Sequence, residues 1–288
     1  MALPRAEWRT DHRLWIEAFV VFNLAGLAFD IFLAHSENHF RRSTEYIPLV
    51  FSIAAAPLLA ALIALRHRWP AVWRDVGHLI GWSAVAIGIA GLVLHLDSRF
   101  FYERTIRSLT YAAPFAAPLA FTGLGLLVIA NRMVDSASID WPRWMLLLAV
   151  GGFIGNFVFS LTDHAMNGFY NPLEWIPVVT SALAVGWMIV PVVMPVPAAY
   201  LKACAYVVAI QAGVGLLGFA LHAASILREP AGGIIERLSG GAPLMAPLLF
   251  PNLSILALIS LWVLARHPDA LDAMDPARLH GSPPAGGQ

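Results

Sequence analysis

The chain has 288 residues, of which 59% are hydrophobic and only 12% are charged, and its formal net charge is zero. A soluble domain is usually about one quarter charged, so this composition argues against a soluble globular protein. The zero net charge gives no basis for nucleic-acid binding. Because Cys204 is the only cysteine, an internal disulfide, a cysteine-based zinc site and an iron–sulfur cluster are excluded.

Apolar runs of about 20 residues recur along the whole chain, and each is long enough to cross the hydrocarbon core of a bilayer. A backbone exposed to lipid must satisfy its own hydrogen bonds, so each run is predicted to be helical. The sequence therefore predicts an all-α polytopic membrane protein with eight transmembrane helices, at about 14–35, 46–65, 78–97, 110–131, 143–163, 175–195, 201–222 and 243–265. The first run is too long for a cleaved signal peptide.

The two halves of the chain repeat one another. Nine of the 23 positions from 35 to 57 are identical to those 129 residues later; among them, His35, Asn38, Phe40, Glu45, Ile47, Pro48 and Ser52 recur as His164, Asn167, Phe169, Glu174, Ile176, Pro177 and Ser181. The residues Gly88, Gly91, Leu94 and His95 recur as Gly215, Gly218, Leu221 and His222. The segment Leu109–Phe121 matches Leu238–Phe250 at seven of 13 positions. This pattern indicates an internal duplication.

Each repeat contains four helices, an even number, so both repeats are predicted to have the same orientation in the membrane. The two repeats are then related by a pseudo-two-fold axis along the membrane normal. The predicted parts are a cytoplasmic N-terminal segment, a first repeat, a cytoplasmic linker, a second repeat and a disordered cytoplasmic tail, at 1–13, 14–132, 133–142, 143–265 and 266–288. Eleven Lys and Arg residues fall on the side of the termini and seven on the other side. This distribution predicts an inner-membrane protein with both termini in the cytoplasm.

Four histidines are retained in both repeats, at the predicted ends of the first and third helices: His35, His95, His164 and His222. All four are expected at one face, the outer one, at similar depth. Neutral imidazole suits copper, iron and zinc, so one or two transition-metal ions are predicted there, with the four rings within about 10 Å of a common point. Glu45 and Glu174 are expected to complete or support the site, and the expected supporting groups are Asn38, Asn167, Asp30, Asp97 and Asp163.

Two other interpretations of the histidines stay open. Paired histidines from different helices can hold haem b. Histidines at helix ends can also be structural, because they cap the last carbonyls and interact well with the helix dipole.

The function is correspondingly open between three classes. A metal site near the membrane surface suits a redox enzyme acting on a lipophilic molecule such as a quinone or lipid. It also suits a metal carrier, whereas structural histidines suit an assembly subunit of a membrane complex. No phosphate-binding loop, dinucleotide fingerprint or serine-hydrolase elbow is present. The partner subunits, if any, are not indicated.

Other residues are predicted to be architectural. Glu17 is expected to reach the inner membrane interface, and the paired glycines of the third helix in each repeat are expected to allow close helix packing. The Ala-Pro-x-x-Ala-Pro segments are predicted to shape the entry of the fourth helix of each repeat, with no chemical role.

Overall fold

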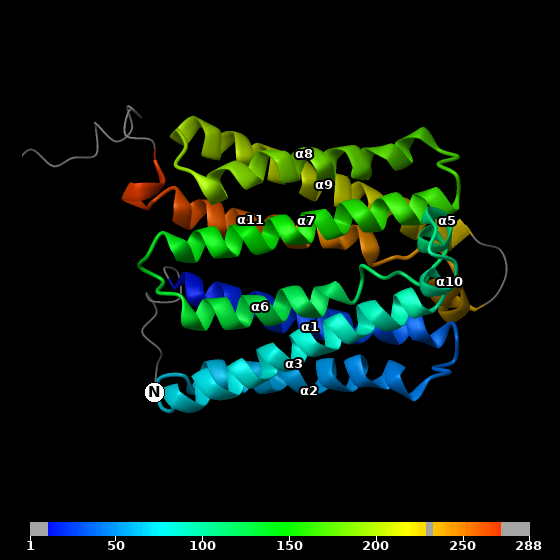
Figure 1. Cartoon of the computed structure of the whole chain (residues 1–288), viewed down its shortest axis with the longest axis horizontal. Helices are drawn as coiled ribbons and strands as arrows, with labels where there is room; N and C mark the ends of the chain where they lie inside the picture. The colour runs from blue at the N-terminus through cyan, green and yellow to red at the C-terminus, as the bar shows by residue number, and fades with distance from the viewer. Residues whose placement is uncertain (1–10, 229–232, 272–288) are drawn as a thin grey trace, which may run out of the picture.

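The computed structural model describes residues 11–228 and 233–271, and these form one bundle of roughly parallel and antiparallel helices (Figure 1). The all-helical prediction is confirmed: within the described ranges the only β-type pairing is an isolated bridge between Val196 and Leu271. Most of the predicted terminal segments, residues 1–10 and 272–288, lies outside the described residues. The described start of the predicted tail forms a short 3-10 helix, Pro268–Ala270, in which Ala270 is buried.

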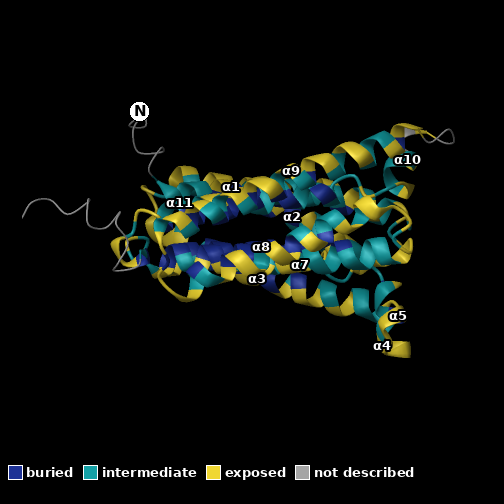
Figure 2. Cartoon of the chain, turned by 90° about the horizontal axis from the view of Figure 1, so that it is seen from above, coloured by how far each residue is buried: buried dark blue, intermediate teal, exposed yellow. Residues whose placement is uncertain are grey.

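Seven helical segments are long and apolar enough to cross a membrane, which is compatible with a multi-pass membrane protein. Their outward faces carry large exposed apolar side chains such as Phe22, Leu79 and Tyr206, while buried residues follow the inward faces (Figure 2). The helices are α1 (His12–Ser36), α2 (Tyr46–Leu65), α3 (Pro70–Asp97), α7 (Asp140–Met166), α8 (Trp175–Val193), α9 (Ala198–Arg228) and α11 (Leu249–Leu264). The segments containing α2, α8 and α11 start with the 3-10 turns Ser43–Glu45, Pro172–Glu174 and Ala246–Leu248.

The fourth predicted span differs from the expectation. Its helix, α6 (Leu119–Met133), has 15 residues and is therefore about 22 Å long, short of the roughly 30 Å hydrocarbon core. The predicted start at 110 is instead the end of α5 (Ile106–Thr110), which follows α4 (Phe100–Glu103). Residues 111–118 are not helical, because Pro114 and Pro118 disfavour helical geometry in the residues before them.

The helices of each half pack mainly on one another, and the halves meet through α6 against α7 and α1 against α11. The side chains of Asn23 in α1 and Asn252 in α11 hydrogen-bond to each other across this boundary. The short helices also cross it: α5 packs on α7 of the second half, and α10 (Ile234–Gly240) packs on α1 of the first half. They extend from opposite sides of the same end of the bundle (Figure 2).

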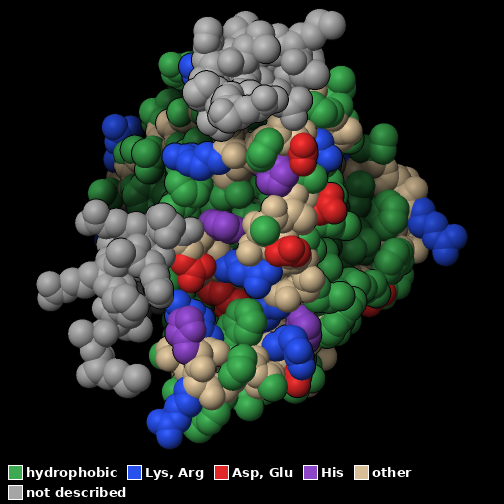
Figure 3. Space-filling model, turned by 90° about the vertical axis from the view of Figure 1, so that its left-hand side faces the viewer, with side chains coloured by type: hydrophobic (Ala, Val, Ile, Leu, Met, Phe, Trp, Pro, Cys, Tyr) green, Lys and Arg blue, Asp and Glu red, His purple; other side chains and the backbone are tan. Residues whose placement is uncertain are grey.

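Charged and histidine side chains gather at the other end, where the termini lie (Figure 3). Glu17 does not reach the interface as expected. It is buried and accepts two hydrogen bonds from Arg132 in α6, from Nε at 2.8 Å and from Nη2 at 2.7 Å. The Arg132 guanidinium also lies over the Trp73 ring and donates to the Trp73 carbonyl. Pairing with a buried cation removes the need for the carboxylate to reach water.

The second half replaces this ion pair with hydrocarbon. The positions 129 residues after Glu17 and Arg132 hold Leu146 and Leu261, and both leucines are buried. Gly77 makes room for the guanidinium, since a Cβ there would lie 0.9 Å from Nη1 of Arg132. A buried ion pair in the first half and buried leucines in the second half therefore stand at corresponding sequence positions.

Changing Glu17 to Leu alone should destabilise the protein by about 3–5 kcal/mol, because it leaves Arg132 buried and unpaired. Changing both Glu17 and Arg132 to Leu, as in the second half, should recover most of that loss. Thermal unfolding in detergent measures both. Equal melting temperatures for the single and double variants would contradict this account.

Glycines in α3 allow the close packing that the sequence predicts, and the neighbour, which was not predicted, is the start of α6 at Pro118 and Thr122. A Cβ on Gly88 would lie 2.3 Å from Thr122 Oγ1, and one on Gly91 would lie 2.7 Å from Pro118 Cβ. In the second half, a Cβ on Gly215 would lie 2.5 Å from the Pro247 carbonyl oxygen. Both third helices therefore approach the proline-containing segment more closely than any side chain would allow.

Gly88→Ala should destabilise the bundle by about 1–3 kcal/mol, since the added methyl group meets backbone and side-chain atoms of α6. Gly123→Ala in α6 is the matched control, because no atom lies within 4 Å of a Cβ there. Thermal unfolding of the two variants is the measurement. If Gly123→Ala were as damaging as Gly88→Ala, close packing would not explain the glycine at position 88.

Candidate functional site

The predicted histidines belong to the end of the bundle opposite the termini, where α1 joins α2 and α7 joins α8 (Figure 1). His35, His95 and His164 lie in the last turns of α1, α3 and α7. His222 differs from the prediction, because α9 continues for six residues beyond it, to Arg228.

The turn after His35 and the turn after His164 are built alike. Phe40 and Phe169 donate their backbone N–H groups to the carbonyls of His35 and His164, at 3.0 and 3.1 Å. Both phenylalanines have left-handed backbones, with φ of 49° and 51°. This conformation is unfavourable for a bulky residue, so it persists only where the surroundings impose it.

Aromatic packing supplies that support. The Phe40 ring stacks on Tyr46 at 4.6 Å and lies 5.8 Å from the His35 ring, measured between ring centroids. Phe169 stacks on Trp175 at 4.0 Å and lies 6.2 Å from His164. These turns place the following glutamates, at the ends of the 3-10 turns, next to the histidines.

In the first half the structure brings His35, Glu45 and His95 together; we call them the first group. His35 Nδ1 lies 3.5 Å from Glu45 Oε2, and the centroids of the His35 and His95 rings are 6.3 Å apart. Asn38 supports Glu45, donating from Nδ2 to Oε1 at 3.4 Å. The side chain of Asn38 also accepts the backbone N–H of Phe40 at 3.0 Å.

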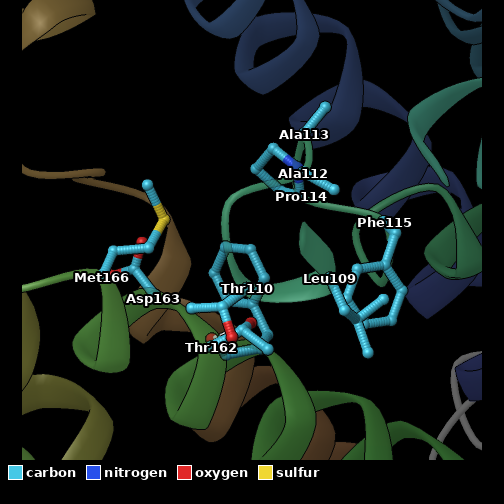
Figure 4. Close-up of a pocket in the computed structure, with 10 residues that line it drawn as sticks. Leu109, Thr110, Ala112, Ala113, Pro114, Phe115, Thr162, Asp163 and Met166 are labelled. Atoms are coloured by element: carbon cyan, nitrogen blue, oxygen red, sulfur yellow. Dashed lines mark hydrogen bonds between the residues drawn. The ribbon is translucent and has the colours of Figure 1, made fainter. Parts of the chain in front are cut away.

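The second group, in the second half, consists of His164, Glu174, His222 and Asp163. His164 Nδ1 lies 3.7 Å from Glu174 Oε2. Asp163 is within electrostatic range of both His164 and His222. Asp163 lines a small pocket between α7 and residues 109–115, with Thr162 and Met166 on one side and Pro114 on the other (Figure 4).

The third-helix histidine of each group is fixed by a proline carbonyl. His95 Nδ1 lies 2.9 Å from the Pro114 oxygen, and His222 Nδ1 lies 2.9 Å from the Pro243 oxygen. A carbonyl oxygen can only accept, so Nδ1 is the protonated nitrogen of each ring. In the neutral imidazole Nε2 then holds the free lone pair, which is the arrangement of many metal-binding histidines.

One carboxylate oxygen of each glutamate could accept a hydrogen bond but receives none from the described residues. Oε2 of Glu45 and Oε2 of Glu174 are buried, and neither accepts a hydrogen bond from the described residues. The two side chains are only 14% and 12% exposed, so water gives them little compensation. A buried polar atom that accepts no hydrogen bond costs free energy, and in both halves this Oε2 atom faces a histidine Nδ1, at 3.5 and 3.7 Å, without a hydrogen bond.

Several predicted members do not join these groups. Asn167 is exposed, unlike Asn38. Asp30 and Asp97 are half-buried, and no hydrogen bond or ion pair of the described residues links either to the retained histidines. Among the described residues, the rings of His35 and His95 are the only two retained histidine rings in contact with each other.

The structure thus brings one pair of retained histidines into contact, His35 and His95. Within the described ranges, no three His, Cys, Asp or Glu side chains are already placed to hold one metal ion. Two imidazoles on one tetrahedral zinc ion have centroids roughly 5 Å apart, given bonds of about 2.0–2.1 Å. The 6.3 Å between His35 and His95 would have to shorten by about an ångström for both to bind one ion.

Sequence reasoning missed the role of the prolines. Pro114 and Pro243 were expected only to shape helix entry, but their carbonyls accept from the histidines. The retention of His and Ala-Pro in both halves is the signal that could have linked them. Nothing in the sequence pairs Asp163 with the Pro114 segment, because that contact crosses between the halves.

Three comparisons with known proteins were made: no protein-family model, no curated protein and no solved structure matches this chain. The roles of the two groups therefore rest on the chemistry of their own residues.

Proposed function

We propose that the chain is a membrane metalloprotein in which each half holds a transition-metal ion beside its retained histidines. The observation that carries this proposal is that Oε2 of Glu45 and Oε2 of Glu174 are buried, face a histidine Nδ1 and accept no hydrogen bond. A cation held next to the carboxylate would offset the cost of burying it.

The donor set is suited to a metal. His95 and His222 present Nε2 lone pairs, and their Nδ1 atoms are held by backbone oxygen. His35 and His164 face carboxylates with Nδ1, so the lone pairs of their Nε2 atoms are also left for a metal ion. A carboxylate or carbonyl behind a ligand imidazole fixes its orientation and raises its basicity. Glu45 and Glu174 then act as supports for the ligands, and copper, iron and zinc all fit imidazole nitrogen.

The proposal includes the architecture in which these groups are set. Two four-helix repeats related by a pseudo-two-fold axis along the membrane normal would place both groups at one face, and the matched contacts of His95 and His222 support this arrangement. The excess of Lys and Arg on the side of the termini favours an inner-membrane orientation with the groups outside.

Two imidazole ligands leave coordination positions open. An open position on copper or iron suits redox chemistry on a lipophilic molecule such as a quinone, and reversible binding suits a metal carrier. Haem b and a metal-free structural role are the competing interpretations of the same histidines.

The test is the metal content and absorption spectrum of the full chain, purified in detergent without a histidine tag. We expect near-stoichiometric copper, iron or zinc, lost when His35 and His164 are both changed to Ala. His39→Gly is the matched control, because Gly168 stands at the corresponding place and His39 has a φ of 56° that glycine adopts freely.

Each other outcome identifies a competing interpretation. A Soret band that disappears in the double variant would establish haem. A wild-type protein without metal or chromophore after incubation with each ion, together with a double variant that only melts earlier, would establish a structural role.

The support role of the glutamates makes a separate prediction. Glu45→Gln together with Glu174→Gln should weaken metal affinity by about 10–100-fold without abolishing binding, as loss of an orienting carboxylate does. Competition with a metallochromic chelator measures the affinity. Unchanged affinity would exclude the glutamates from the site.

A further inference from the structure

The chain that follows α3 forms a closed loop at the end of the bundle; we call residues 98–113, which include α4 and α5, the α4–α5 loop. It begins directly after the membrane-length helix α3, which ends at Asp97. Ser98 Oγ accepts a hydrogen bond from the backbone N–H of Ala113 at 2.9 Å, so the two ends of the loop are joined. On the other side, α5 packs on α7, and Ser108 in its middle is buried. The loop is therefore held at the level of the helix ends, and it extends to one side of the bundle (Figure 2).

Large apolar side chains of this loop are turned away from the protein. Tyr102 is 76% exposed and Ile106 is 86% exposed, and Phe101 and Tyr111 are exposed as well. Apolar groups in water are unfavourable, whereas beside the end of a membrane span they can enter the boundary between headgroups and acyl chains. Tyrosine is enriched at that level because its ring is amphipathic. The exposed side of the loop thus has the composition of a surface that lies on a bilayer.

The loop also carries positive charge that the protein does not neutralise. From Arg99 to Tyr111 there are three arginines and one glutamate. Glu103 is paired with Arg99, whose Nε lies 3.6 Å from Oε1 of Glu103 and whose guanidinium lies over the Tyr111 ring. Arg104 and Arg107 are exposed, and no hydrogen bond, ion pair or ring contact of the described residues involves their guanidinium groups. Two positive charges are therefore left for an anion outside the protein.

The backbone of Arg104 is unusual. It caps the end of α4 with a left-handed φ of 53°, a conformation in which glycine is common because it has no Cβ. An arginine here has a backbone cost that no side-chain contact of the described residues offsets. The corresponding part of the second half, residues 228–241, has two arginines and two glutamates. The excess positive charge therefore belongs to the first half.

We propose that the α4–α5 loop binds anionic phospholipid at the bilayer surface beside the bundle. Tyr102 and Ile106 enter the headgroup region, and the guanidinium groups of Arg104 and Arg107 bind lipid phosphate, whose geometry suits the arginine fork. Each basic residue near an anionic membrane surface strengthens the attraction by roughly fivefold, whereas a zwitterionic headgroup has no net charge to attract it. This inference does not depend on the metal sites.

Quenching of a fluorophore within the loop by spin-labelled lipid tests the proposal. Ile106→Cys in the full chain takes an environment-sensitive label at the most exposed of these apolar positions, and the unsubstituted chain is the labelling control because Cys204 is buried. The protein is reconstituted into phosphatidylcholine vesicles that contain equal small fractions of spin-labelled phosphatidylglycerol or spin-labelled phosphatidylcholine. Both lipids should quench, and phosphatidylglycerol should quench more strongly, by on the order of fivefold. Added salt should reduce this preference by screening.

Three double or single variants of the labelled chain identify the groups responsible. Arg104→Gln with Arg107→Gln should bring the ratio of the two quenching efficiencies close to one. Arg104→Lys with Arg107→Lys keeps the charge and should retain most of the preference. Arg228→Gln removes an exposed arginine at the same end of the bundle, in the half without excess charge, and should leave the ratio unchanged.

The outcomes that overturn the proposal are distinct. Equal quenching by the two lipids, or a preference that survives loss of both arginines, would show that the loop does not select anionic lipid. No quenching by either lipid would show that the loop faces water or another protein. The salt series uses the labelled chain with both arginines in place, so its result does not depend on how well the arginine variants fold.

Discussion

A backbone carbonyl outside a helix needs a hydrogen-bond donor from elsewhere, and at the end of the bundle that holds the retained histidines two histidine side chains provide it. The chain between α5 and α6 is not helical over residues 111–118, so its peptide groups lack the partners that a helix provides. The Pro114 carbonyl finds its donor in His95, and the Pro243 carbonyl finds one in His222. The same hydrogen bond fixes the histidine ring and leaves the lone pair of its other nitrogen free to bind a metal ion. Fold and candidate chemistry thus depend on one contact, made twice.

The two halves share this frame and differ in where they place buried charge. At the end near the termini, the first half buries Glu17 with Arg132 while the second half has Leu146 and Leu261 in the matching places. At the opposite end of the bundle the second half has the additional charged residue, because Asp163 stands where the first half has Ala34. A charge that has a partner, as in the first case, stabilises only the packed state. Asp163, in the second case, makes no hydrogen bond or ion pair with the residues that the structure describes.

Much of the fold could be predicted from the sequence, because apolar runs of membrane length and lipid-exposed backbones leave helices as the solution. Seven of the eight predicted spans correspond to long helices, and the fourth is shorter because Pro114 and Pro118 keep residues 111–118 out of helical geometry. The association of His35 with Glu45 followed from their joint retention. Pairing of Glu17 with Arg132 could not be predicted, since it depends on which helices are neighbours and on the space that Gly77 leaves. The place of Asp163 beside the Pro114 segment depends in the same way on contacts between halves.

The exchange of short helices between the halves bears on how such a chain could arise. Helix α5 packs on α7, and α10 packs on α1, so a short helix of each half contacts the first long helix of the other half. A single unit of this kind would leave the end of its first helix uncovered, whereas two identical copies could cover one another by the same exchange. Joining two such copies in one chain preserves the contact and allows each copy to change alone. A residue such as Asp163 can then be acquired by one partner, which a symmetric dimer of identical chains can never do.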